Sequence, residues 1–209
     1  GGCGRSPAVE NTLTAFVNAI RMGVEFVEFD IQRSADGVYF CAHDDHVDTP
    51  AGRRAVADLP MAEIDFLCGT RARYEEVLAL LSEHDRKAHL DLKFTSPERA
   101  YADPAATWEV DVVKLARRFL PDEAIVVTTS EDRSVRAVRD WCDNEGISLL
   151  IGLSIGRHRL PGMSLWQKAC WRVREPFPAA RIRACRANLV VAQRHLARWR
   201  LISWAARNN

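Results

Sequence analysis

Apolar residues recur along this chain in two alternating patterns. One has the three- or four-residue spacing of an amphipathic helix, and the other is a short apolar run typical of a buried strand. The first pattern predicts helices on four apolar stripes: Leu13, Phe16, Val17 and Ile20; Tyr74, Val77, Leu78 and Leu81; Trp108, Val112, Leu115 and Phe119; Val135, Val138, Trp141 and Cys142. The second predicts strands over residues 24–32, 38–43, 87–94, 124–130, 147–153 and 188–193. Strands and helices that alternate without a linker predict one α/β domain, residues 1–209, with a largely parallel sheet.

Local signals mark the ends of several of these elements. Asn11 is placed to cap the first helix and Gly23 to end it. The pair Asp36-Gly37 predicts a turn between the first two strands, and a polar loop is expected over residues 44–54. The last residues, 196–209, predict an amphipathic helix.

A parallel sheet of this kind is either open and doubly wound or closed as a barrel. In a barrel one face of each strand points inward and the other meets the helices, whereas an open sheet carries apolar helices on both faces. The polar side chains of two predicted strands share one face, toward the C-terminal ends where barrel enzymes carry their chemistry: Glu28, Asp30, His89, Asp91 and Lys93. This separation favours a (β/α)8 TIM-type barrel.

Three of those side chains are carboxylates that can converge. Glu28 and Asp30 lie two residues apart on a strand and therefore point the same way, and Asp91 has the matching parity on another strand. Three anions in one place must be protonated, paired with cations or bound to a metal ion. An all-oxygen cluster suits Mg²⁺ or Ca²⁺, while an ion-pair network with Lys93 and nearby arginines is the structural alternative.

Other polar residues carry weaker signals. His43 ends a predicted strand beside two aspartates and is a candidate proton shuttle, or a hydrogen-bonded loop residue. Cys41 has no neighbouring base in the sequence and is interpreted as interior packing. The basic run from Arg172 to Arg186 is typical of a solvated face, with binding to phospholipid headgroups as the alternative.

Composition limits the partners. The 29 Lys and Arg residues against 28 Asp and Glu residues give a formal charge of +1, which argues against a nucleic-acid partner. No apolar stretch reaches the roughly 20 residues that cross a bilayer, so a soluble chain is predicted and membrane contact is not indicated. The six cysteines form no C-x-x-C pair and are interpreted as reduced thiols; a cytoplasmic location is favoured.

A longer string of residues carries a family resemblance. The order and spacing of these segments closely resemble the opening of the glycerophosphodiester phosphodiesterase family: Val9-Glu10-Asn11-Thr12-Leu13, Ala15-Phe16, Gly23, Val27-Glu28-Phe29-Asp30-Ile31, Asp36-Gly37, His43-Asp44-Asp45, Val56-Ala57-Asp58-Leu59, Glu75-Glu76-Val77-Leu78-Ala79-Leu80-Leu81 and Leu90-Asp91-Leu92-Lys93. Residues 188–207 resemble the late strand and helix that precede the family's final barrel strands.

The resemblance implies a (β/α)8 barrel and hydrolysis of glycerophosphodiesters to glycerol phosphate and an alcohol with a divalent cation. It assigns Glu28 and Asp30 as metal ligands, and Asp91 stands where the third ligand is usually glutamate. It also assigns Lys93 to the substrate phosphate and His43 as one of two catalytic histidines.

Two departures from the family pattern leave alternatives open. The second histidine belongs to a His-Arg-Gly motif that is absent before the opening Gly1-Gly2, and the family's last strands are not found in the sequence up to Asn209. Together these departures predict a fragment that lacks the first and last barrel strands. A lysophospholipase D or sphingomyelinase D type would act on lipids, with an apolar groove lined by residues such as Trp166, Trp171 and Phe177. The remaining alternative is a catalytically silent barrel that binds a metal ion.

Overall fold

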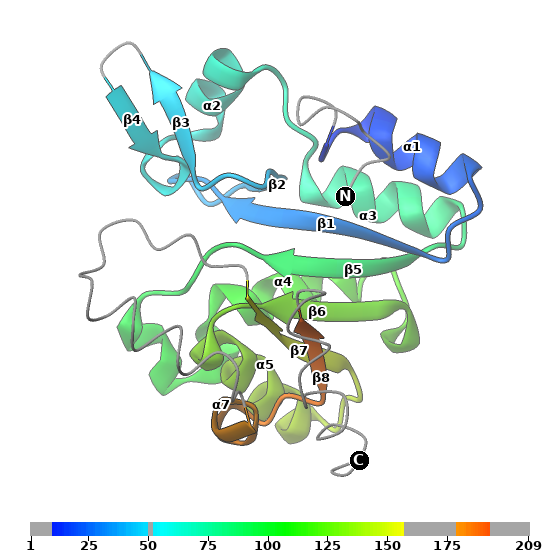
Figure 1. Cartoon of the computed structure of the whole chain (residues 1–209), viewed down its shortest axis with the longest axis vertical. Coiled ribbons are helices and arrows are strands. Elements are labelled where there is room, and N and C mark those ends of the chain that lie inside the picture. Colours follow the sequence, from blue (N-terminus) through cyan, green and yellow to red (C-terminus); the bar gives the residue numbers. More distant parts are fainter. Residues whose placement is uncertain (1–9, 50–51, 157–178, 193–209) are drawn as a thin grey trace.

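The computed structural model describes residues 10–49, 52–156 and 179–192 (Figure 1). The helix predicted over residues 196–209, the aromatic residues of the lipid alternative, and Arg172 and Arg174 of the basic run lie outside these ranges. Within them, no helix is long and apolar enough to cross a membrane.

Most of the strands join one sheet. Its order is β2-β1-β5-β6-β7-β8, in which β2 is antiparallel to β1 and the other pairs are parallel; β3 and β4 form a separate hairpin. The strands are β1 (Phe26–Arg33), β2 (Tyr39–Cys41), β3 (His46–Thr49), β4 (Gly52–Ala55), β5 (Lys87–Leu92), β6 (Ile125–Thr129), β7 (Leu150–Ile155) and β8 (Leu189–Ala192).

Helices separate the parallel strands, as the apolar stripes predict. The α-helices are α1 (Leu13–Arg21), α2 (Met61–Cys68), α3 (Tyr74–Glu83), α4 (Trp108–Ala116), α5 (Asp132–Glu145) and α7 (Ala179–Cys185), and the 3₁₀ helices are η2 (Val56–Asp58), η3 (Glu98–Ala102), η4 (Pro104–Ala106) and η5 (Asp122–Ala124). In α7, Arg181 pairs with Asp132, and Arg186 just after it pairs with Asp140 and Asp143. The described part of the basic run is therefore an ion-paired helix face.

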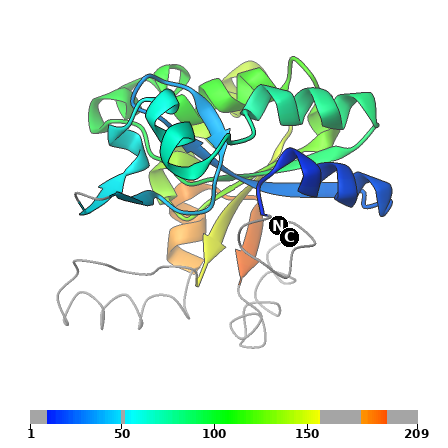
Figure 2. The same ribbon diagram turned by 90° about the horizontal axis from the view of Figure 1, so that it is seen from above.

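The strand order decides between the two sheet architectures. Each successive parallel strand adds beside the previous one, from β1 through β5, β6 and β7 to β8, with no reversal. A doubly wound sheet reverses direction at a switch point, whereas a barrel winds in one direction. Figure 2 shows β7 and β8 turning out of the plane of β1 and β5, so the sheet is curved. The winding and the curvature are those of a barrel wall.

The two faces of this wall differ as the parity analysis predicts. Residues such as Phe29, Ile31 and Leu90 are fully buried in one large apolar core that also includes α1, α3, α4 and α5. Cys41 is buried in the same core, as predicted, and burial raises the pKa of its thiol. The four described cysteines are free. The carboxylate-bearing face is turned away from this core.

The predicted polar loop over residues 44–54 is wrong. These residues contribute to the β3–β4 hairpin, whose Val47 lies in a second, smaller apolar cluster with residues of β2, η2 and α2. Asp36 Oδ1 accepts the backbone N–H of Met61 at 3.0 Å and so ties the start of α2 to the predicted turn. Val47 is the one buried residue of β3 and β4, and a single apolar position is too weak a pattern to predict a strand.

The strand predicted over residues 147–153 begins three residues later than expected. Gly146 takes a left-handed conformation with φ of +68° and ends α5, and the N–H of Ile147 donates to the Cys142 carbonyl at 2.8 Å. Ile147 thus completes the helix end and does not start the strand.

A buried carboxylate joins the segment after β5 to the outer helices. Glu109, in the first turn of α4, is fully buried and accepts hydrogen bonds from Ser96 N–H at 3.1 Å, Tyr101 OH at 2.6 Å and Ser134 Oγ at 2.5 Å, together with the Ser96 hydroxyl. Burial and the Glu109 carboxylate both raise the pKa of Tyr101. This network holds the chain that leaves β5 against α4 and α5.

We expect Glu109→Gln to lower the free energy of unfolding by about 2 kcal/mol, because an amide accepts at one oxygen only and leaves a buried donor unpaired. Glu123→Gln, the same change at an exposed position, should leave that free energy within about 0.5 kcal/mol of the wild type. Denaturant unfolding measures both. Equal stability of the two variants would contradict a structural role for the Glu109 network.

Candidate metal centre

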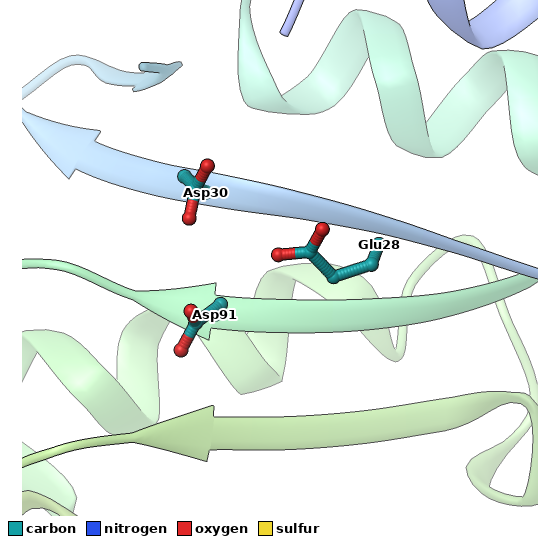
Figure 3. A group of neighbouring side chains, drawn as sticks. All are labelled: Glu28, Asp30 and Asp91. Atoms are coloured by element: carbon teal, nitrogen blue, oxygen red, sulfur yellow. The ribbon is translucent and has the colours of Figure 1, made fainter. Parts of the chain in front are cut away.

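Three carboxylates meet on the inner face of β1 and β5. Glu28 and Asp30 project from β1 and Asp91 from β5, and Asp30 and Asp91 lie near the C-terminal ends of their strands (Figure 3). Asp30 is directly opposite Asp91 in the parallel ladder, and Glu28 is opposite His89. One oxygen from each carboxylate lies within 4.8 Å of the others. The structure therefore brings together the three residues that strand parity selects.

Lys93 lies between two of these carboxylates. Its Nζ is 2.9 Å from Asp30 Oδ1 and 2.5 Å from Asp91 Oδ2. Burial alone would lower the pKa of the ammonium, but its attraction to Asp91 and Asp30 outweighs burial and raises that pKa. The ion pairs that the sequence allows are thus formed, and they keep Lys93 charged at the place where the carboxylates converge.

Asn11 has a different role from the one predicted. Thr12, not Asn11, caps α1, since its Oγ1 accepts the Ala15 N–H at 3.2 Å. Asn11 takes a left-handed conformation with φ of +57°, which asparagine tolerates better than most residues. Its Nδ2 donates to Asp30 Oδ2 at 2.9 Å, and its Oδ1 accepts the Asp30 N–H at 3.2 Å. Asn11 therefore fixes Asp30 from outside the sheet.

These contacts set the charge state of Asp30. Burial favours the neutral acid and would raise its pKa, but the Lys93 charge, the Asn11 hydrogen bond and the nearby His43 together lower the pKa below its ordinary value. Asp30 is thus an anion over the whole neutral range. A hard cation needs such a ligand, because a protonated carboxyl cannot give both oxygens to a metal ion.

Two residues without a predicted role hold Asp91. Thr128, on β6, donates its hydroxyl to Asp91 Oδ1 at 3.0 Å, and His89 Nε2 is 2.9 Å from the same hydroxyl oxygen. Strand parity places His89 on the carboxylate face. The strand predicted over residues 124–130 contains Thr128, but only the register of β5 against β6 shows that Thr128 is opposite Asp91. That register is not readable from local patterns.

His43 lies at the same rim, after β2. Ala42 N–H donates to the Asp30 carbonyl at 3.2 Å, which fixes the chain next to the carboxylates. The His43 ring is more than half exposed, and its Nδ1 is 3.1 Å from Asp44 Oδ1. A carboxylate at Nδ1 favours the proton on that nitrogen and leaves Nε2 with its lone pair.

The donor set fits a divalent cation. All three ligands are carboxylates, the donors that Mg²⁺ and Ca²⁺ prefer. Asp30 Oδ1 is buried and accepts no hydrogen bond of good geometry; its close contact is the ion pair with Lys93. This oxygen therefore faces a positive charge, as a cation ligand does. Beside the cluster is a cavity of about 280 Å³, lined by Glu28, His89, Asp91, Thr128, Ser154 and Val191 among others.

Comparison with known proteins places this arrangement in a family. The family model for the glycerophosphoryl diester phosphodiesterase family matches residues 1–141, and the chain belongs to that family. A glycerophosphodiester phosphodiesterase of Arabidopsis thaliana is 36% identical over 103 residues, which are 43% of this chain and 31% of that protein. One from Caldanaerobacter subterraneus subsp. tengcongensis is 26% identical over 153 residues, or 68% of this chain and 60% of that protein. The chain thus spans less than two thirds of the length of either relative.

Solved structures support the same fold. A glycerophosphodiester phosphodiesterase from Parabacteroides distasonis superimposes with a TM-score of 0.68 at 13% identity, covering 98% of this chain and 77% of that one. A phosphodiesterase from Oleispira antarctica, in complex with the product sn-glycerol-3-phosphate, gives a TM-score of 0.58 at 18% identity, covering 100% and 87%. With the one-directional winding of the sheet, these likenesses confirm the TIM-type barrel fold, of which the described strands form an open arc.

We expect Asn11→Gly to lower the free energy of unfolding by about 2 kcal/mol, because glycine keeps the left-handed backbone while both hydrogen bonds to Asp30 are lost. Asn11→Asp should destabilise more at neutral pH than at pH 4, since it adds a second carboxylate beside Asp30. Denaturant unfolding at the two pH values measures this. A pH-independent effect of Asn11→Asp would contradict the assignment of Asp30 as an anion held by Asn11.

Proposed function

We propose that this protein is a divalent-cation-dependent phosphodiesterase, which hydrolyses glycerophosphodiesters to glycerol phosphate and an alcohol in glycerophospholipid metabolism. The convergence of Glu28, Asp30 and Asp91 around Lys93, in a chain of this family, is the observation that carries the proposal. Neither the family nor the fold alone assigns an activity, because barrels of one fold serve many reactions.

In this proposal the three carboxylates hold Mg²⁺ or Ca²⁺. When bound, the cation supplies Lewis-acid polarisation of a phosphoryl oxygen. The carboxylates would hold the cation on the inner face of β1 and β5, with Asp30 and Asp91 toward the C-terminal ends of the strands, the end of a barrel where substrates bind. Asn11 and Thr128 orient two of them through hydrogen bonds to the carboxylate oxygens.

Lys93 and His43 complete the chemistry. The Lys93 ammonium, kept charged by its carboxylate partners, is placed to stabilise negative charge on the phosphodiester. His43 transfers a proton at Nε2, while Asp44 at Nδ1 orients the ring. The transfer is to or from the attacking oxygen or the leaving alcohol, on the solvent-accessible rim of the site.

A cavity of about 280 Å³ beside the cluster supports a small-molecule substrate, because it opens directly onto Glu28 and Asp91. The Oleispira antarctica protein binds its product sn-glycerol-3-phosphate. A headgroup-bearing glycerophosphodiester, such as glycerophosphocholine, is therefore the proposed class. No described residue favours the lysophospholipid alternative.

We expect chelation with EDTA to abolish hydrolysis of glycerophosphocholine and added Mg²⁺, Ca²⁺ or Mn²⁺ to restore it. Glu28→Gln should reduce turnover by about 10²-fold or more and weaken cation binding, since it removes one of three charged ligands. Glu25→Gln is the matched control, because Glu25 pairs with Lys87 at the opposite end of β1. Release of glycerol phosphate measures activity. Full activity after exhaustive chelation would overturn the metal requirement.

We expect His43→Ala to lower turnover by about 10²-fold with little change in cation affinity, as for a proton-transfer residue that does not ligate the metal. His46→Ala is the matched control, since His46 contacts Asp45 as His43 contacts Asp44 but lies on the hairpin. Steady-state kinetics and calorimetric titration with Mn²⁺ separate the two readouts. Equal turnover of both variants would remove His43 from the proposed reaction.

A further inference from the structure

We propose that Thr128 and His89 act as a positioning pair that orients Asp91 and thereby sets the affinity of the site for a divalent cation. This inference rests on the proposed function, because it concerns the same carboxylate cluster. Neither residue is a ligand in that proposal, and both act through Asp91.

The hydrogen-bond directions follow from the number of protons available. A threonine hydroxyl has a single proton, which Thr128 donates to Asp91 Oδ1 at 3.0 Å. The contact of 2.9 Å between His89 Nε2 and the same hydroxyl oxygen must then use a proton on Nε2. The order is therefore from the His89 N–H to the Thr128 hydroxyl and on to the Asp91 carboxylate. Thr128 is directly opposite Asp91 in the β5–β6 ladder, and His89 lies two residues before Asp91 on the same face of β5.

The two oxygens of the Asp91 carboxylate have different partners, and the attraction of Lys93 for one of them is opposed by the hydrogen bond of Thr128 to the other. Lys93 Nζ is 2.5 Å from Oδ2, the oxygen that Thr128 does not contact. The Asp91 carboxylate is almost completely buried, so water cannot replace a lost partner cheaply. With Thr128 on Oδ1 and Lys93 on Oδ2, the plane of the carboxylate is fixed between two strands. Loss of the Thr128 hydroxyl removes the hydrogen bond that holds Oδ1 and leaves the attraction of Lys93 for Oδ2 in place.

The packing around Gly152 limits the side-chain conformations of Thr128. A Cβ added at Gly152 would lie 3.1 Å from the Thr128 methyl and 3.1 Å from Leu189 Cγ, closer than ordinary contacts. The Thr128 methyl group thus packs directly against the backbone of β7. The absence of a side chain at Gly152 leaves room for that methyl group and so permits the rotamer in which the hydroxyl donates to Asp91. Gly152 therefore contributes to the orientation of a residue two strands away.

The decisive experiment compares Thr128→Val with Thr128→Ser in the full 209-residue chain. Valine keeps the shape and loses the hydroxyl, whereas serine keeps the hydroxyl. We expect Thr128→Val to weaken Mn²⁺ binding, measured by calorimetric titration of the metal alone, by 10- to 100-fold, about the effect of losing an outer partner of a ligand. Thr128→Ser should bind Mn²⁺ with an affinity within about threefold of that of the wild type.

A second pair of variants tests His89 independently of Thr128. Glutamine can place an N–H near the position of Nε2, whereas leucine cannot, so His89→Leu should weaken Mn²⁺ binding by about 10-fold and His89→Gln should restore most of it. Denaturant unfolding of each metal-free variant shows whether it is folded. A loss of affinity without recovery in the serine and glutamine variants would indicate a general packing effect and overturn the inference.

The outcomes separate this inference from the proposed function. If the wild-type chain binds no Mn²⁺, the metal centre itself is wrong, and the positioning role is overturned with it. If the wild type binds Mn²⁺ and Thr128→Val binds it equally well, the metal centre stands and the positioning role of Thr128 is wrong.

Discussion

The repulsion among three carboxylates on one face of a sheet governs the site and much of its surroundings. Each oxygen near the centre needs a partner that stabilises negative charge, and the neighbours supply different kinds: an ammonium from Lys93, an amide from Asn11 and a hydroxyl from Thr128. The donors come from the chain before α1, from the end of β5 and from β6. The cost of gathering the charges is therefore offset only when these segments are correctly folded together.

The packing of the rest of the barrel wall allows the three carboxylates to lie close together. Its outer face is apolar and packed by helices, so the strands gain most of their stability on the side away from the site. The Glu109 network then fixes the chain after β5, the segment that begins with Lys93, against α4 and α5. The fully buried Glu109 side chain thus stabilises the segment that follows Lys93.

Sequence patterns within single strands predicted much of the fold and the three carboxylates of the site. The features that these patterns missed depend on contacts between segments far apart in the sequence. Alternation along β1 and β5 predicted that Glu28, Asp30 and Asp91 would converge, because parity depends on adjacent residues alone. Asn11 was predicted as a helix cap, since asparagine before a helix has that local use, and its bond to Asp30 depends on a partner 19 residues away. The pairing of β5 with β6 likewise determines the role of Thr128.

The division of the apolar residues into two clusters has a consequence for motion. Small cooperative units open more readily than large ones, and local opening does not require the whole domain to unfold. Phe40 belongs to the small cluster under the hairpin and Cys41 to the main core, so the chain crosses between units just before His43. The carboxylates belong to the wall, while His43 follows residues 40–41, where the chain passes from the small cluster to the main core. Local opening of the small cluster would therefore reach the chain beside His43 before it reaches the strands that carry the carboxylates.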